Sequence, residues 1–176
     1  AEFRVRAADH IQERFFNGGA LTPQANRARL LTRSNEIYRA IVAESARWGD
    51  AKRPAQPFTR TDWIAEMNRV YAYLGQRGDI VLNQLRQKNL FPNVLAPQLS
   101  HYGPLVDSGY QLHMTNSNSG GTIFYTLDGS DPRRPGGSVS TSAIAYETPI
   151  SLNAHTVIRT RVLTQDGWSP LVKATF

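Results

Sequence analysis

The chain has 176 residues, no cysteine and a formal net charge of +6. This length accommodates one ordinary domain or two small ones, and the lack of cysteine excludes disulfide bonds and thiol catalysis. No stretch of about 18 apolar residues occurs, so the sequence predicts no transmembrane helix.

The basic excess lies entirely in the first half of the chain. Residues 1–92 carry 15 Lys and Arg against 9 Asp and Glu, whereas residues 93–176 carry 5 of each. The arginines alternate with acidic residues along predicted helices and form no continuous basic stripe. We therefore expect a solvated helical surface, or a face that docks on another domain, and no nucleic-acid partner.

Apolar residues at helical spacing dominate the first half. A first helix is predicted over residues 2–16 and ends at a Gly-Gly pair. A long arginine-rich helix follows over residues 22–48, with Thr22 as its N-cap and proline in its first turn. A third helix is predicted over residues 62–74, with Thr61 as its N-cap. A break at Gly75 and Gly78 follows, and then a short helix over residues 80–88.

The second half changes to short strands and turns after the proline-containing linker at residues 91–97. Strand patterns recur at roughly 8–12-residue spacing, which is typical of a β-sandwich. They cover residues 98–99, 110–115, 122–127, 144–146, 156–163 and 172–176. The predicted fold class is therefore α+β in two domains: a helical segment at 1–92 and an immunoglobulin- or fibronectin-III-like sandwich at 93–176.

The most informative stretch of the chain is residues 121–133, an alternating strand followed by a turn. The period of two puts Ile123, Tyr125 and Leu127 on the predicted inward face and Phe124 on the other. Asp128-Gly129-Ser130-Asp131-Pro132 then supplies turn residues. This order of strand, Asp-Gly-Ser turn and proline resembles the C-terminal sandwich of chitobiase and β-hexosaminidase-type enzymes. The resemblance implies an accessory module without catalytic residues.

A second resemblance covers the helical half. It rests on the run Glu44-Ser45-Ala46-Arg47-Trp48-Gly49-Asp50, placed between the Gly-Gly helix stop and a later Gln84-Leu85 helix that leads to Phe91-Pro92. This order resembles the C-terminal helices of the spore coat protein H (CotH) kinase-like family. The resemblance implies an atypical kinase fold, but the family's nucleotide- and metal-binding carboxylates lie upstream of these helices, so no catalytic residue is carried over.

A candidate polar cluster lies in the same run: Glu44, Arg47, Trp48 and Asp50. Glu44 and Arg47 have the i,i+3 spacing of a helical ion pair. The functional interpretation is a patch that faces a substrate or phosphate. The favoured interpretation is structural, an ion pair beside a Trp48 that is buried in a core.

The sequence contains no recognisable catalytic or metal-binding constellation. The four histidines are scattered, and there is no nucleophile elbow or phosphate-binding glycine loop. Asp128, Ser130 and Asp131 offer oxygen ligands to calcium, but their turn satisfies its own backbone, and whether calcium binds stays open. We therefore expect no cofactor and no enzymatic activity of this chain itself.

Aromatic residues of the sandwich are the candidate ligand-binding groups. An exposed ring can stack on a sugar, although aromatic residues in small sandwiches are mostly core. The candidates are Phe124, Trp168, Tyr102 and Tyr110.

These observations predict the C-terminal part of a larger bacterial secreted or cell-envelope protein. The leading function is a structural spacer or interaction module whose partner is an upstream domain of the same polypeptide. One alternative is a carbohydrate-binding accessory module with a polysaccharide partner. The other is the C-lobe portion of an atypical protein kinase that acts on surface proteins.

Overall fold

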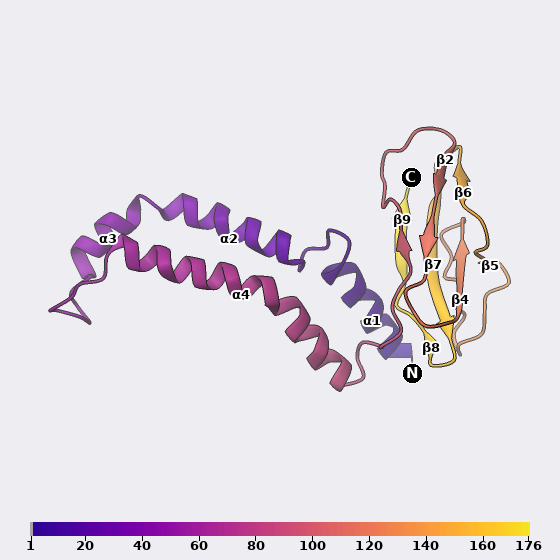
Figure 1. The fold of residues 1–176 in the computed structure, drawn as a ribbon, viewed down its shortest axis with the longest axis horizontal. Helices are drawn as coiled ribbons and strands as arrows, with labels where there is room; N and C mark the ends of the chain where they lie inside the picture. Colours follow the sequence, from indigo (N-terminus) through magenta and orange to yellow (C-terminus); the bar gives the residue numbers. More distant parts are fainter. Residues whose placement is uncertain (1) are drawn as a thin grey trace. The chain divides into compact units, whose positions relative to one another are not determined.

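A computed structural model describes residues 2–176 and confirms an α+β chain (Figure 1). Within these residues four helices precede nine strands. The helices are α1 (Glu2–Phe15), α2 (Pro23–Ile37), α3 (Ala40–Trp48) and α4 (Arg60–Gln87). The strands are β1 (Gln98–Leu99), β2 (Tyr110–Leu112), β3 (Met114–Thr115), β4 (Thr122–Thr126), β5 (Ile144–Ala145), β6 (Ile150–Leu152), β7 (Val157–Thr164), β8 (Gly167–Trp168) and β9 (Val172–Thr175).

The chain forms two compact units, which we describe separately. The first unit contains the residues up to Asn17 together with Leu82–Phe176, and the second contains Gly18–Val81. Helix α1 therefore belongs with the strands, a grouping that the sequence did not predict. The domain boundary between residues 92 and 93 stays a prediction.

Strand β7 is the centre of the first unit. It pairs antiparallel with β4 on one edge, and with β8 and β9 on the other edge, while β5 extends the sheet beyond β4 (Figure 1). Two smaller antiparallel pairs, β1 with β3 and β2 with β6, supply the remaining strands. All named pairings are antiparallel, as expected of a sandwich.

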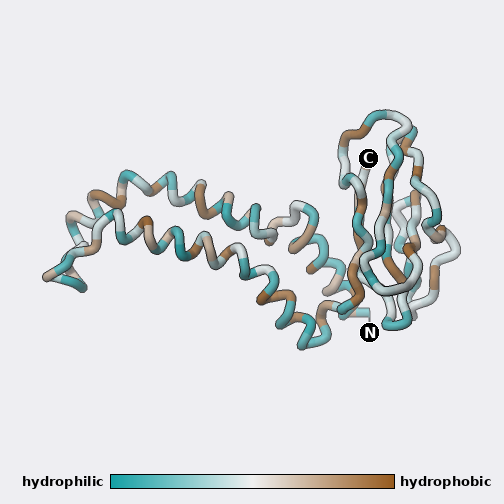
Figure 2. The backbone as a smooth tube through the Cα atoms, viewed as in Figure 1, coloured by the Kyte–Doolittle hydropathy of each residue, from teal (hydrophilic) through white to brown (hydrophobic). Residues whose placement is uncertain are grey.

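The sandwich core is built from alternate residues of these strands. Ile158 and Val162 of β7 and Leu112 of β2 are completely buried. Figure 2 shows hydrophobic residues distributed along the strands, with hydrophilic residues between them. Burial of about 1.5–3 kcal/mol per large aliphatic side chain makes this cluster the main stabilising element of the module.

Helix α1 contributes a second, smaller core within the same unit. Its apolar face includes Ala8, which is buried together with Leu82 at the end of α4 and Phe91 of the linker. The rings of Phe16 and Phe91 stack with centroids 6.0 Å apart. Asn17 then takes a left-handed conformation (φ 52°), which ends the helix, as expected near a Gly-Gly pair.

The second unit contains α2, α3 and most of α4. Thr22 caps α2 as predicted, because its hydroxyl accepts a hydrogen bond from the Ala25 N–H at 3.4 Å. The single helix expected over residues 22–48 is wrong in one respect: it is interrupted between Ile37 and Ala40. The interruption is small, because Tyr38 and Arg39 keep right-handed helical angles.

Helix α4 corrects two further predictions. It begins at Arg60, before the predicted N-cap at Thr61. The Asp62 carboxylate in its first turn accepts hydrogen bonds from the N–H and the hydroxyl of Thr59. It also continues without a break through Gly75 and Gly78, because about 1 kcal/mol per glycine does not stop a 28-residue helix. At Gly75 the guanidinium of Arg27 on α2 lies where a Cβ would be, and this flexible group would have to move for any other residue.

The strand predictions hold for most of the sandwich. Strands β6 and β8 lie outside the predicted strand ranges, in stretches of the sequence that show no clear alternation. The inward placement of Leu127 is wrong, since its side chain is 43% exposed after β4 has ended at Thr126. Thr126, which by alternation shares the outer face with Phe124, is completely buried, and its hydroxyl donates to the carbonyl of Ser130 at 2.6 Å.

Candidate functional site

A buried arginine is the most unusual feature of the first unit. Arg161 lies in β7, opposite Phe124 of β4, and its side chain is 0% exposed. Arginine is almost never completely buried unless it is paired. The position therefore requires partners that satisfy all five of its N–H groups.

Two aspartates and one carbonyl supply those partners, and we call Arg161, Asp9 and Asp131 the Arg161 cluster. Nε and Nη2 of Arg161 donate to the two carboxylate oxygens of Asp131 at 2.8 and 2.6 Å. Nη1 and Nη2 donate to the two oxygens of Asp9 at 2.8 and 2.7 Å. Nη1 also donates to the carbonyl of Ser169 at 2.9 Å. Both carboxylates are thus bound in the two-pronged geometry that is strongest for arginine.

The cluster joins three parts of the chain that are distant in sequence. Asp9 lies on α1, and its Oδ1 also accepts the Leu171 N–H at 2.8 Å just before β9. Asp131 lies in the turn after β4 and also accepts the Arg133 N–H at 2.9 Å. The cluster consequently fixes α1 and the turn to the central strand of the sheet.

The electrostatics of the cluster favour the charged forms. Burial opposes ionisation of Asp131, but the hydrogen bonds from Arg161 outweigh it and lower the pKa of the carboxyl. Burial likewise opposes the guanidinium charge, but hydrogen bonds to Asp131 and Asp9 raise the pKa of Arg161. Asp131 is thus held as a carboxylate and Arg161 as a guanidinium.

A second ion pair holds the start of α1. Arg133 donates through Nη1 and Nη2 to the two oxygens of Glu2 at 2.8 and 2.9 Å, and the Gly136 N–H donates to the same carboxylate at 3.2 Å. Chiefly because of the hydrogen bond from Arg133, the pKa of Glu2 falls to about 2. Helix α1 is therefore bound to the sandwich at both its first and its third turn.

The oxygen atoms of the turn at Asp128, Ser130 and Asp131, considered above for calcium, are engaged by protein contacts. Asp128 Oδ1 accepts the N–H and the hydroxyl of Ser130 at 2.9 and 2.6 Å. Asp131 is engaged with Arg161. Within residues 2–176 no group of three His, Asp or Glu side chains gathers in a way that could hold a metal ion.

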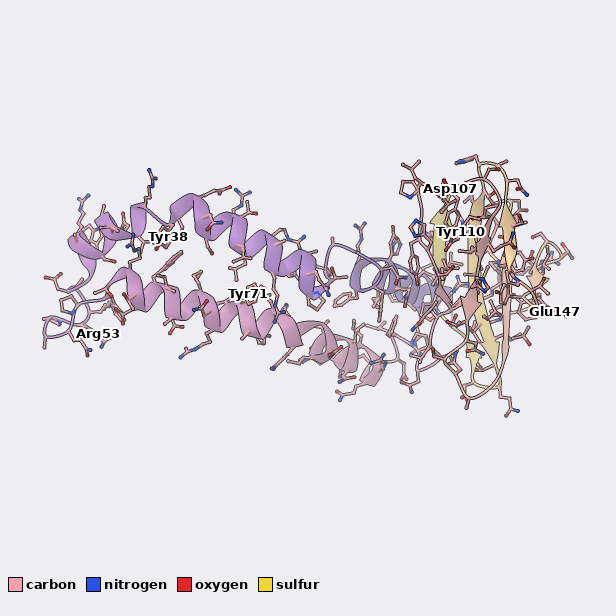
Figure 3. The ribbon with its side chains drawn as sticks, turned by 45° about the horizontal axis from the view of Figure 1, so that its top comes forward. Tyr38, Arg53, Tyr71, Asp107, Tyr110 and Glu147 are labelled. Atoms are coloured by element: carbon pink, nitrogen blue, oxygen red, sulfur yellow. The ribbon has the colours of Figure 1, made fainter. Side chains whose placement is uncertain are left out.

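The four aromatic candidates are partly buried and make internal contacts. Phe124 packs against Trp168 with ring centroids 5.8 Å apart, and the Trp168 indole N–H donates to the Gly137 carbonyl at 2.7 Å. Tyr102 accepts the Leu99 N–H at 3.2 Å, and the hydroxyl of Tyr110, labelled in Figure 3, lies 3.0 Å from that of Ser100. The structure therefore gives each ring a packing role within the sandwich.

The polar cluster of the second unit differs from its favoured interpretation. Trp48 is 57% exposed, so the expectation that it is buried in a core is wrong. Arg47 lies over the Trp48 ring, 4.9 Å from its centroid, and forms no ion pair with Glu44 within the described residues. Glu44 and Trp48 line one open groove with Phe58 and Trp63, whereas Arg47 and Asp50 do not line it.

Other arginines of the second unit also lie over aromatic rings. Arg53 lies 4.6 Å from the Phe58 ring centroid, and Arg27 lies 4.5 Å from that of Tyr71; Arg53 and Tyr71 are labelled in Figure 3. Arg27 also donates to the Tyr71 carbonyl at 3.0 Å. These contacts show how the basic excess is accommodated on the helices.

No helix among residues 2–176 combines the length and hydrophobicity needed to cross a bilayer.

Sequence reasoning missed the Arg161 cluster completely. Arg161 and Asp9 are separated by 152 positions, and no local pattern connects them. One signal was present: Arg159 and Arg161 are the only charged residues in the predicted strand at residues 156–163, and they share one face of it. Charges at two successive outward positions of a central strand call for partners of opposite charge when another element covers that face.

Comparison with known proteins identifies the sandwich alone. A protein-family model described as "Fn3 associated" matches residues 112–176. No curated protein matches the chain, and no solved structure matches it. The matched region carries Arg161 and Asp131 but not Asp9. It indicates a fibronectin-III-associated β-sandwich, which is a structural or interaction module.

Proposed function

We propose that the chain is a non-catalytic structural segment whose sandwich holds helix α1 in a fixed position. The observation that carries this proposal is the Arg161 cluster, in which every N–H of a buried guanidinium is used to join α1, a turn and the central strand. Such a group is saturated by its partners, so it has no free donor for a substrate. Its chemistry suits fixed attachment.

The finer identity of the sandwich belongs to the same proposal. We assign it to the chitobiase C-terminal-like modules, and the support is the turn after β4. Asp128 bonds the backbone of Ser130, Gly129 has a φ of 75°, and Thr126 bonds the Ser130 carbonyl. Thr126, Asp128, Gly129 and Ser130 thus each have a local role in the turn.

The second unit is proposed to be the C-terminal helical part of a CotH-like kinase domain, packed on an upstream portion of the same polypeptide. In residues 18–81 no hydrophobic side chain is buried, and large apolar side chains are exposed along all of its helices. Examples are Leu31, Val42, Trp48 and Ile80. A helical pair without a core of its own is stabilised when its apolar face packs on another element.

In this account the parent protein is secreted or belongs to the cell envelope of a bacterium. The module supports a catalytic domain of the parent protein and does not itself bind nucleotide or cleave substrate. Binding of an extended polysaccharide across Phe124, Trp168, Tyr102 or Tyr110 is the less favoured role, because stacking along such a chain needs exposed rings and these four are partly buried.

The proposal is tested with the purified chain. We expect no ATP turnover with Mg²⁺, no cleavage of a chromogenic hexosaminide, and no retention on insoluble chitin or cellulose. Turnover that a single polar substitution abolishes would overturn it. So would retention that is lost on Phe124→Ala while the melting temperature stays unchanged.

A further inference from the structure

A cavity of about 220 Å³ lies within the first compact unit, next to the Arg161 cluster. Its wall combines α1, the end of α4, the linker, and the residues from β8 to β9. Its polar and aromatic lining residues include Arg4, Arg86, Asn89, Asn93 and Trp168. We call this the basic cavity.

The charge of the wall is positive. Arg4 and Arg86 line it, and within residues 2–176 neither forms an ion pair. Arg161 also reaches the wall, but Asp9 and Asp131 neutralise it and use its donors. No carboxylate is among the lining residues. Two unneutralised guanidinium groups around a partly enclosed space favour an anion.

Positions of the two free arginines differ in a useful way. Arg4 is exposed on α1, whereas Arg86 is half-buried and is held by the side-chain oxygen of Asn83 at 3.1 Å and by the Phe91 ring at 5.4 Å. Arg86 is therefore oriented before a ligand arrives, and Arg4 is free to close over it. Preorganised cations lose less entropy on binding than flexible ones.

The remaining wall suits a sugar ring. Trp168 is fixed by its indole hydrogen bond to Gly137 and by its contact with Phe124, so its ring is a rigid surface. The amides of Asn89 and Asn93 can donate to and accept from hydroxyl groups. The cavity is smaller than the roughly 300–1,000 Å³ of pockets for drug-sized ligands, so it suits one sugar residue.

We propose that the basic cavity binds a single anionic sugar, one that carries a carboxylate or a phosphate. The anion lies between Arg4 and Arg86, and the sugar ring lies against Trp168. This proposal concerns a site that the structural role of the module does not require, so it stands or falls independently of that role.

Isothermal titration calorimetry of the full chain tests it with four probes: glucuronate, glucose 6-phosphate, neutral glucose and inorganic phosphate. We expect saturable binding of at least one anionic sugar and much weaker binding of glucose and of phosphate alone. Arg4→Ala and Arg86→Gln should each raise the dissociation constant of the anionic sugar about tenfold, because each removes charge-assisted hydrogen bonds. Arg6→Ala is the matched control, since Arg6 is exposed on the same helix and does not line the cavity.

Each outcome decides the proposal. Binding that weakens as the ionic strength rises from about 0.05 to about 0.5 M, and a shift of the Trp168 indole N–H resonance on addition of the sugar, would support it. No saturable binding of either anionic sugar, equal binding of glucose, or equal binding of inorganic phosphate would overturn it. An equal loss in Arg6→Ala and Arg4→Ala would also overturn it, because the effect would then be one of net charge.

Discussion

Arg161 shows how a charge can be buried on the outer face of a small sandwich, where α1 and the turn after β4 cover the sheet. Removing a guanidinium from water is costly, and the two bidentate carboxylates and the Ser169 carbonyl offset that cost only while all of them stay in place. The geometry is specific to arginine, because lysine keeps the charge but lacks the planar fork. The sandwich therefore folds stably only when Asp9, Asp131 and the Ser169 carbonyl are all in position around Arg161.

Replacement of Arg161 by lysine should therefore lower the free energy of unfolding substantially. We expect Arg161→Lys to cost about 3–5 kcal/mol, the range for breaking a buried ion pair. Urea unfolding followed by circular dichroism measures this. Arg6→Lys is the control for a charge-conserving change at an exposed site of α1 and should change the stability by less than about 0.5 kcal/mol. Equal stability of Arg161→Lys and the unmodified chain would contradict a tightly coordinated arginine.

Glu2 provides a pH-dependent test of the same attachment. Its pKa lies at about 2 in the folded chain, well below the ordinary value of 4.5. A lowered carboxyl pKa stabilises the folded state above the unfolded-state pKa, and this contribution is lost as the pH falls from about 4.5 to about 2. The lowered pKa of Asp131 acts in the same direction.

The Glu2 carboxyl can be followed directly by NMR. We expect its carbon resonance to titrate with a midpoint near 2 in the unmodified chain, and near the ordinary value in Arg133→Gln, where the guanidinium is absent. A midpoint near 4.5 in the unmodified chain would show that Arg133 does not hold the start of α1 in solution.

At the end of α3, burial decides the contribution of a residue to stability more than its size does. Trp48 is the largest apolar side chain of its helix but is mostly exposed, whereas its neighbour Gly49 is buried. A Cβ on Gly49 would collide with the backbone carbonyls of Phe58 and Ser45. The Phe58 N–H donates to the Gly49 carbonyl at 2.9 Å, so this close approach closes the loop over residues 50–57.

The glycine should consequently contribute more to stability than the tryptophan. We expect Trp48→Ala to lower the free energy of unfolding by less than about 1 kcal/mol, because an exposed ring loses little burial. Gly49→Ala should cost about 1–3 kcal/mol, the range for an overpacked site. Thermal unfolding of the two variants measures the order. The reverse order would indicate that Trp48 packs on a surface of the chain in solution.

Regular elements were predictable to the extent that their signals are local. Helix periodicity located α1 and α4, and the alternating pattern located β4 and β7, because each contains its whole signal within one stretch. The predicted break at Gly75 failed because a glycine costs only about 1 kcal/mol, which the remaining residues of a 28-residue helix outweigh. The site was not predictable, since Asp9, Asp131 and Arg161 meet only through the tertiary fold.

The whole chain divides into two compact units whose cores differ. One unit combines the sandwich with α1 and the end of α4, and it has a main core and a buried ion cluster. The other unit, residues 18–81, has no buried hydrophobic side chain. These differences predict unequal resistance to local unfolding, because opening free energies follow the buried contacts of each region.

Native-state amide hydrogen exchange of the full chain tests the central claim, that α1 is an integral part of the sandwich. We predict that amides in the middle of α1 exchange with an opening free energy close to that of β7 amides. Asp9→Ala should selectively lower the protection of α1, while the protection of β4 and β7 falls less. Protected β7 amides together with α1 amides that exchange as fast as those of an isolated peptide helix would contradict the account.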